Sequence, residues 1–236
     1  SMDGSAGSEN DNLAVGYGAL GGSIDGGEYN VAIGNYSLDA NTSGDYNLAM
    51  GINALSANTT GARNIGIGPG ALDAPDTEND NLAIGYDALG GTIAGGEYNV
   101  AVGNSSLKAL TSGDHNVGMG YDALTANTTG YSNIAIGHAA LKTNTIGRDN
   151  IAIGDSALLD LATTSEYDGY FNVAVGSNAM EDATTAYRNV AMGAYALNSV
   201  TSAGDNVALG FQGMDNATSG CGNIAFSYRA LYGGTS

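Results

Sequence analysis

Short apolar stretches recur along the chain at a nearly constant interval, separated by longer polar segments. Each stretch begins with Asn and continues with an aliphatic residue, Ala or Gly, a large apolar residue, and Gly or Ser; a Leu or Met follows four residues later. The thirteen starting residues are Asn12, Asn30, Asn47, Asn64, Asn81, Asn99, Asn116, Asn133, Asn150, Asn172, Asn189, Asn206 and Asn223. The steps between them are 17 or 18 residues, with one step of 22, and this fixed period indicates a repeat protein.

Within each repeat the apolar stretch alternates with a period of two, which is typical of a β-strand. It is too short, and too rich in Gly and β-branched residues, to form a helix. Polar segments such as Asn41–Gly44 and Asn58–Gly61 combine residues that favour turns. We therefore expect each repeat to form one coil, with a strand, a turn, a second short strand and another turn. Thirteen stacked coils with parallel strand pairing make an all-β, parallel β-solenoid.

The invariant Asn and the Gly that ends most stretches have structural interpretations. Asn tolerates turn conformations, and its amide can bind backbone groups or the Asn of the next coil in a stacked column. The Gly marks a backbone bend or a close approach of another backbone.

The two faces of each predicted strand differ in side-chain size. Ala and Gly form one face and large aliphatic residues the other, and no charged residue occurs on the Ala/Gly face in any repeat. We expect the large residues to fill the interior of the coil. The Ala/Gly face, which includes Ala135 and Ala152, is then expected to pack against other chains, and a homotrimer is the simplest closed arrangement.

Composition narrows the classes of function. The 236 residues contain 24 Asp and Glu but only 6 Lys and Arg, and a net charge of −18 argues against nucleic acid or anionic membranes as partners. No apolar run approaches the roughly 20 residues that span a bilayer, so direct membrane insertion is not expected. Residues 1–10 are predicted to be a tag remnant and polar leader, and residues 11–236 one repeat domain with an insertion at 160–171.

The string Asn30–Gly34 and its variants resemble the head-domain repeat of trimeric autotransporter adhesins of the YadA type. Similar repeats occur in phage tail fibres and in other bacterial surface fibres. The resemblance covers about residues 11–232 and implies a left-handed parallel β-roll assembled as an intertwined or side-by-side homotrimer. The repeats here are longer than the usual head repeat because a polar turn such as Ala57–Gly61 is expanded.

Candidate catalytic residues are few and scattered. His115, His138 and Cys221 lie in different repeats and positions, so we predict a protein that is not an enzyme and needs no cofactor. Stacked carboxylates would offer Ca²⁺ several oxygen ligands, which keeps calcium binding open as an alternative. These carboxylates precede the repeating Asn and are Asp11, Glu28, Asp45, Asp80, Glu97, Asp114, Asp149 and Asp205.

The single long step, between Asn150 and Asn172, is the most specific candidate for a binding site. It inserts five residues into the segment Asp160–Phe171 and gathers aromatic and acidic side chains on one turn. Rings stack on the apolar face of a sugar while carboxylates accept its hydroxyls. The candidate ligand-binding residues are Glu166, Tyr167, Asp168, Tyr170 and Phe171.

These observations predict a structural and adhesive segment of a trimeric fibre, located outside the cell on a bacterial surface or a virion. Its partners are expected to be its own copies and a glycan or protein on the surface of a host or prey cell. The alternatives are a carbohydrate- or calcium-binding solenoid, a fibre-borne polysaccharide depolymerase and an ice-binding protein. A tolerated loop that only packs on its neighbour remains an alternative for the insertion.

Overall fold

The computed structural model describes residues 11–232 apart from residues 24, 76, 93, 164, 166 and 217. Over this range the chain is all-β, with thirteen strands of three residues each joined by turns. The described residues contain no helix that is long and apolar enough to cross a membrane. The prediction of an all-β solenoid with parallel strands is confirmed.

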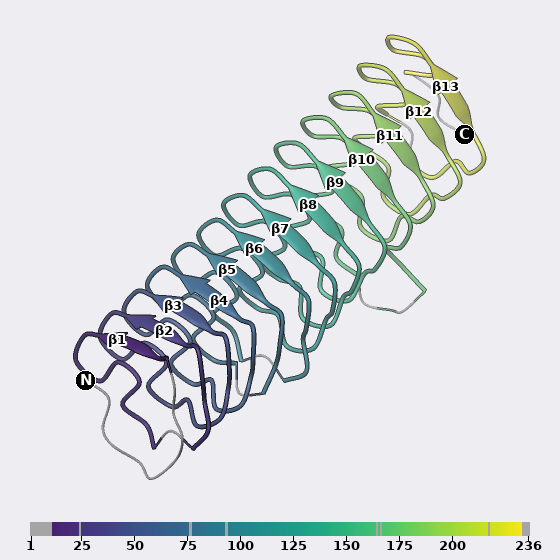
Figure 1. Ribbon diagram of the computed structural model, residues 1–236. Coiled ribbons are helices and arrows are strands. Elements are labelled where there is room, and N and C mark those ends of the chain that lie inside the picture. Colours follow the sequence, from purple (N-terminus) through teal and green to yellow (C-terminus); the bar gives the residue numbers. More distant parts are fainter. Residues whose placement is uncertain are drawn as a thin grey trace. The chain divides into compact units, whose positions relative to one another are not determined.

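The strands belong to two compact units, residues 1–115 and 116–236, each of which is a stack of coils (Figure 1). The first unit contains β1 (Leu13–Val15), β2 (Val31–Ile33), β3 (Leu48–Met50), β4 (Ile65–Ile67), β5 (Leu82–Ile84) and β6 (Val100–Val102). The second contains β7 (Val117–Met119), β8 (Ile134–Ile136), β9 (Ile151–Ile153), β10 (Val173–Val175), β11 (Val190–Met192), β12 (Val207–Leu209) and β13 (Ile224–Phe226).

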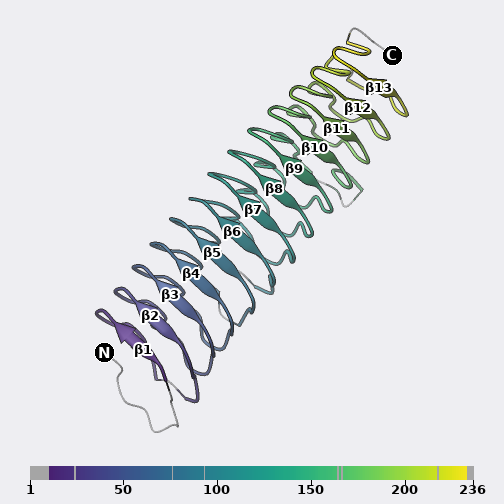
Figure 2. The same ribbon diagram turned by 45° about the horizontal axis from the view of Figure 1, so that its top comes forward.

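Within each unit, consecutive strands pair in parallel and in the register of the repeat. Ala135 of β8 lies opposite Ala152 of β9, and Ala152 lies opposite Ala174 of β10. Figure 2 shows the strands of each unit side by side, with the turns of successive coils following one another along the edges. Equivalent residues of successive coils therefore form columns.

The side of the strand that faces the coil interior is opposite to the one predicted. The strand alanines, including Ala135 and Ala152, are fully buried inside the coil, and the large residues on either side of them are partly exposed. A Cβ added at Gly66, the equivalent position of β4, would lie 3.3 Å from Cγ of Leu55. The interior is thus so thin that a Leu from the turn fills it, and only Ala or Gly fits on the strand side.

The predicted second strand is also wrong, because the segment after each Gly is a turn. In the coil of β2, Tyr36 and Leu38 have φ angles of 58° and 49°, and similar values recur at the equivalent residues of the other coils. Left-handed residues at alternate positions cannot form an extended strand. Burial of Leu38 inside the coil offsets the strain of its left-handed conformation.

The expected role of the Gly after the strand is confirmed. Gly137 has a φ of 137°, and a Cβ at this position would collide with the carbonyl oxygen of Gly154 in the next coil. Only Gly both adopts this conformation and admits the neighbouring backbone.

The expected column of Asn side chains is confirmed as well. In the coil of β8, the Nδ2 of Asn133 donates to Oδ1 of Asn116 at 3.1 Å and to the carbonyl oxygen of Gly147 at 2.7 Å. Both Asn residues are fully buried. The Asn side chains thus provide hydrogen-bond partners for backbone groups that are buried in the coil and cannot reach water.

Candidate functional site

Each unit exposes a continuous apolar surface along its strands, which we call the strand face. It consists of the first and third residues of every strand, all of them apolar and half-buried or exposed. In the second unit Ile136 and Ile153 are each 37% exposed and Met192 is 47% exposed. Its contiguous exposed apolar surface makes the strand face a candidate interaction site.

The insertion of the second unit keeps the coil closed and adds a projecting turn. Thr163 is buried, and its Oγ1 accepts the backbone N–H groups of Ile146 and Gly147 at 3.1 and 2.9 Å. Beyond it, the N–H of Asp168 donates to the carbonyl oxygen of Ser165 at 3.1 Å. Between these two residues, Tyr167 is 81% exposed. The inserted segment therefore presents a tyrosine ring to solvent.

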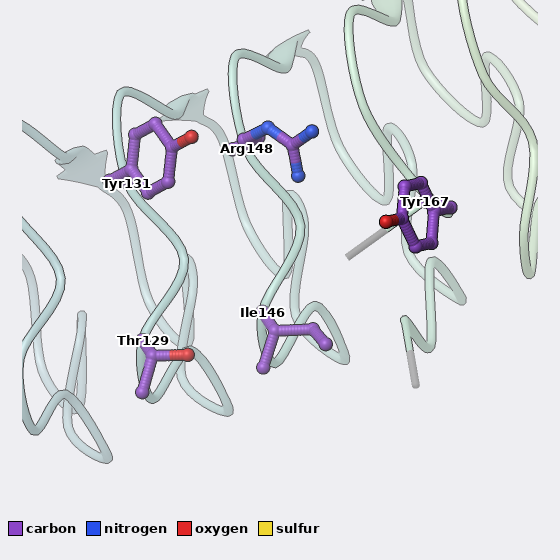
Figure 3. A pocket seen from close by; sticks show the side chains of 5 residues that line it. All are labelled: Thr129, Tyr131, Ile146, Arg148 and Tyr167. Carbon is purple, nitrogen blue, oxygen red and sulfur yellow. The ribbon is translucent and has the colours of Figure 1, made fainter. Parts of the chain in front are cut away.

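A cavity of about 350 Å³ lies beside this ring (Figure 3). Tyr131 and Arg148 occupy the same position in two successive coils, two residues before the repeating Asn. Thr129 and Ile146 precede them by two residues and line the cavity below them, and Tyr167 closes it from the insertion. Three coils therefore contribute to one site.

Tyr170 supports this cavity without lining it. Its ring lies 5.3 Å from Cζ of Arg148 and stacks on Tyr187, with the ring centroids 5.7 Å apart. Phe171 packs against the same ring edge-to-face, at 5.5 Å between centroids. Tyr170 and Tyr187 continue the column that begins with Tyr131 and Arg148. In this column the guanidinium of Arg148 and the ring of Tyr187 both pack against Tyr170.

The five predicted residues are distributed unevenly around this site. Tyr167 lines the cavity, and Tyr170 holds Arg148 from the next coil. Phe171 lies against Tyr170, Asp168 lies in the projecting turn, and Glu166 falls outside the described residues. The sequence analysis missed Tyr131 and Arg148, because neither lies in a repeat of unusual length.

Ion pairs fix part of the column further along the second unit. Arg188 donates through Nε and Nη2 to both carboxylate oxygens of Asp205 at 2.7 Å, and this guanidinium lowers the pKa of Asp205. Its Nη1 also donates to the hydroxyl of Tyr170 at 3.4 Å. In the first unit Arg63 holds Asp80 in the same bidentate way and lowers the pKa of that carboxyl.

The acidic residues before the repeating Asn have structural contacts. Oδ1 of Asp45 accepts the N–H of Glu28 at 2.8 Å, and Oδ1 of Asp114 accepts the N–H of Glu97 at 2.9 Å. Among the described residues, no group of three His, Cys, Asp or Glu side chains is placed to hold a metal ion. Asp45 and Asp114 thus bind the backbone of the preceding coil, while Asp80 and Asp205 bind arginine side chains.

The remaining candidate side chains each have surroundings of their own. Nδ1 of His138 lies 2.8 Å from Oδ1 of Asp155, and the ring of His115 stacks on Tyr98 at 5.1 Å. Cys221 is exposed. None of these three residues lines the cavity.

Comparisons with known proteins give no family for this chain. No protein-family model matches it, and no curated protein sequence matches it.

Proposed function

We propose that this chain is a structural and adhesive segment of a trimeric fibre outside the cell, on a bacterial surface or a virion. In this proposal the coils are left-handed, and three copies pack through their strand faces. The observation that carries the proposal is the strand face, an apolar surface that recurs in every coil and has no charged residue.

A second and third copy of the same chain fit the strand face better than an unrelated partner. Every coil offers two apolar positions at the strand spacing of about 4.8 Å, so identical faces match in period. When the strand faces of three copies turn toward a common axis, they shield one another from water. The three copies then form a closed cyclic assembly. The net charge of −18 then opposes lateral clustering of the assembled fibres.

The resemblance of the Asn30–Gly34 repeat to YadA-type head repeats supports both the handedness and the trimer. It also supports the extracellular setting and a role in contacting a glycan or protein on another cell. The cavity beside Tyr167 favours direct binding by this segment.

Light scattering after size-exclusion chromatography tests the assembly. At micromolar concentration we expect a mass three times the 23.5 kDa of the chain. The double variant Ile136→Glu/Ile153→Glu should be a monomer with an unchanged circular dichroism spectrum, because buried charges without partners disfavour the interface. The control Ala162→Glu/Ser202→Glu adds the same charge at exposed residues outside the strands and should stay trimeric.

Two results would contradict the proposal. One is a monomeric parent protein at these concentrations. The other is a trimer that persists in the Ile136→Glu/Ile153→Glu variant, which would place the contact elsewhere on the coil.

A further inference from the structure

We propose that the cavity between Tyr131 and Tyr167 binds one neutral hexopyranose unit of a surface polysaccharide, with Arg148 donating hydrogen bonds to the sugar oxygens. This inference deepens the surface-binding part of the proposed function and rests on it. It does not require the trimer, since all five lining residues belong to the second unit of one chain.

The lining of the cavity matches the two-sided chemistry of a pyranose. Tyr131, Tyr167 and Ile146 supply apolar surface, on which the C–H face of a sugar packs. The guanidinium of Arg148 supplies donors, and the Thr129 hydroxyl both donates and accepts. Apolar walls with a few convergent polar groups are typical of small-molecule sites.

Arg148 is held in place before any ligand arrives. Its guanidinium lies over the ring of Tyr170, whose other face stacks on Tyr187. The hydroxyl of Tyr170 accepts a hydrogen bond from Arg188, which Asp205 fixes in turn. An ordered guanidinium loses little side-chain entropy on binding, which favours affinity.

The insertion supplies one of the two rings that line the cavity. Tyr131 is 45% exposed and Tyr167 is 81% exposed, so both rings are available to a ligand. The faces of Tyr170 are taken up by Arg148 and Tyr187, so this ring is a support and not a platform. Tyr167 belongs to the repeat that carries five extra residues, so this wall of the cavity comes from the insertion.

The charge of the chain favours a neutral sugar over an anionic one. Asp149 is the sequence neighbour of Arg148, and Asp168 is next to Tyr167, within a protein of net charge −18. The negative charge of the protein repels a polyanion, whereas it does not repel a neutral sugar.

Saturation-transfer NMR with methyl glycosides of glucose, galactose and mannose tests the site. We expect transfer from the protein to the ring C–H protons of at least one glycoside. The variant Tyr131→Ala/Tyr167→Ala should weaken its binding about tenfold or more, because stacking on both walls is lost. The control Tyr17→Ala/Tyr86→Ala removes two exposed tyrosines of the first unit and should bind like the parent.

Arg148→Met tests the polar contact while keeping an unbranched side chain over Tyr170. It should also weaken binding, whereas Arg229→Met should not. Arg229 is the matched control because its guanidinium lies over the rings of Tyr228 and Tyr232 at 5.3 and 4.7 Å, away from the cavity.

The outcomes separate this inference from the proposed trimer. Absence of transfer to all three glycosides, or unchanged binding by the Tyr131→Ala/Tyr167→Ala variant, overturns the sugar site. Binding only to methyl glucuronide, added as an anionic probe, overturns the assignment of a neutral sugar. Light scattering on the same samples reports the assembly independently, so a trimer that binds no sugar refutes the site alone.

Discussion

Asn150 donates two hydrogen bonds to one oxygen of Asn133, the equivalent residue of the preceding coil. Its backbone N–H lies 3.1 Å and its Nδ2 3.2 Å from Oδ1 of Asn133. Its own Oδ1 accepts the backbone N–H of Asn172 at 3.0 Å, and its Nδ2 also reaches the carbonyl oxygen of Gly169 at 2.7 Å. One buried side chain thus connects three successive coils.

Replacing Asn150 with Ala should destabilise the second unit by several kcal/mol. The change leaves the N–H of Asn172 and the carbonyl of Gly169 buried without this partner, and each such group costs about 1–3 kcal/mol. Thermal and urea unfolding followed by circular dichroism measure the loss. Asn104→Ala is the control, because the Asn104 side chain accepts the N–H of Tyr86 on the exposed surface. Equal stability of the two variants would contradict the role of the column.

Ala152→Leu should destabilise the coil and not the assembly alone. Ala152 is fully buried, and overpacking of a closed interior costs about 1–3 kcal/mol. The unfolding midpoint should fall, while Ile153→Leu, on the exposed strand face, should change it little. A variant that folds normally but fails to assemble would instead make the Ala side of the strand the interface.

Gly137→Ala should be destabilising although it adds only one methyl group. The backbone at Gly137 is left-handed, and the new Cβ would meet the carbonyl oxygen of Gly154. Strain of this kind costs about 1–3 kcal/mol. Gly213→Ala is the matched control, because Gly213 stands where most repeats carry Ala, and its nearest contact to an added Cβ is 3.5 Å. Comparable thermal midpoints for both variants would refute the steric argument.

Asp73→Asn should stabilise the protein at neutral pH. Burial and, next, the Asp87 carboxylate raise the pKa of Asp73, and its Oδ1 has no hydrogen-bond partner in the described part of the chain. A raised pKa means that the folded state holds this proton more tightly than the unfolded chain does. Its contribution to stability is therefore present below the unfolded pKa of about 4 and is lost as the pH rises through the folded value.

Thermal unfolding at pH 7 and pH 3 tests this pH dependence of the contribution of Asp73 to stability. The midpoint of Asp73→Asn should exceed that of the parent at pH 7, and the gain should vanish at pH 3. Asp25→Asn removes the same charge at an exposed position and is the control for the effect of net charge. A gain of the same size at both pH values would exclude titration of Asp73 as its cause.

The period and the strands could be predicted from the sequence, but the direction of the strand faces could not. Alternation places Ala135 and Ile136 on opposite sides of β8 without saying which side is inside. The answer depends on what lies across the coil. There the turn contributes a buried Leu, such as Leu141, and leaves room for a methyl group only. Side-chain size alone favoured the wrong side, because the larger residue was assumed to be the buried one.

The candidate site around the cavity was predictable only in part, because most of its residues lie outside the insertion. The step of 22 residues identified the insertion that carries Tyr167, because a change of length is visible along the chain. Arg148 lies one coil and Tyr131 two coils before it, and neither causes an irregularity of its own. Aligning the repeats on their Asn places Tyr131, Arg148, Tyr170 and Tyr187 in one column, and that alignment is the signal that would have found them.

The hydrogen bonds between Asn150 and Asn172 span 22 residues, yet they match those between Asn residues 17 apart. The polar segment before the Asn, which forms a corner of the coil, can thus vary in length. The strand and the buried turn keep the same register with the neighbouring coils. Such a division lets a gene acquire or exchange surface loops one coil at a time without disturbing the neighbouring coils. Recognition could then diversify rapidly on a scaffold that itself changes little, and the corner that holds Tyr167 is where engineered loops should be grafted.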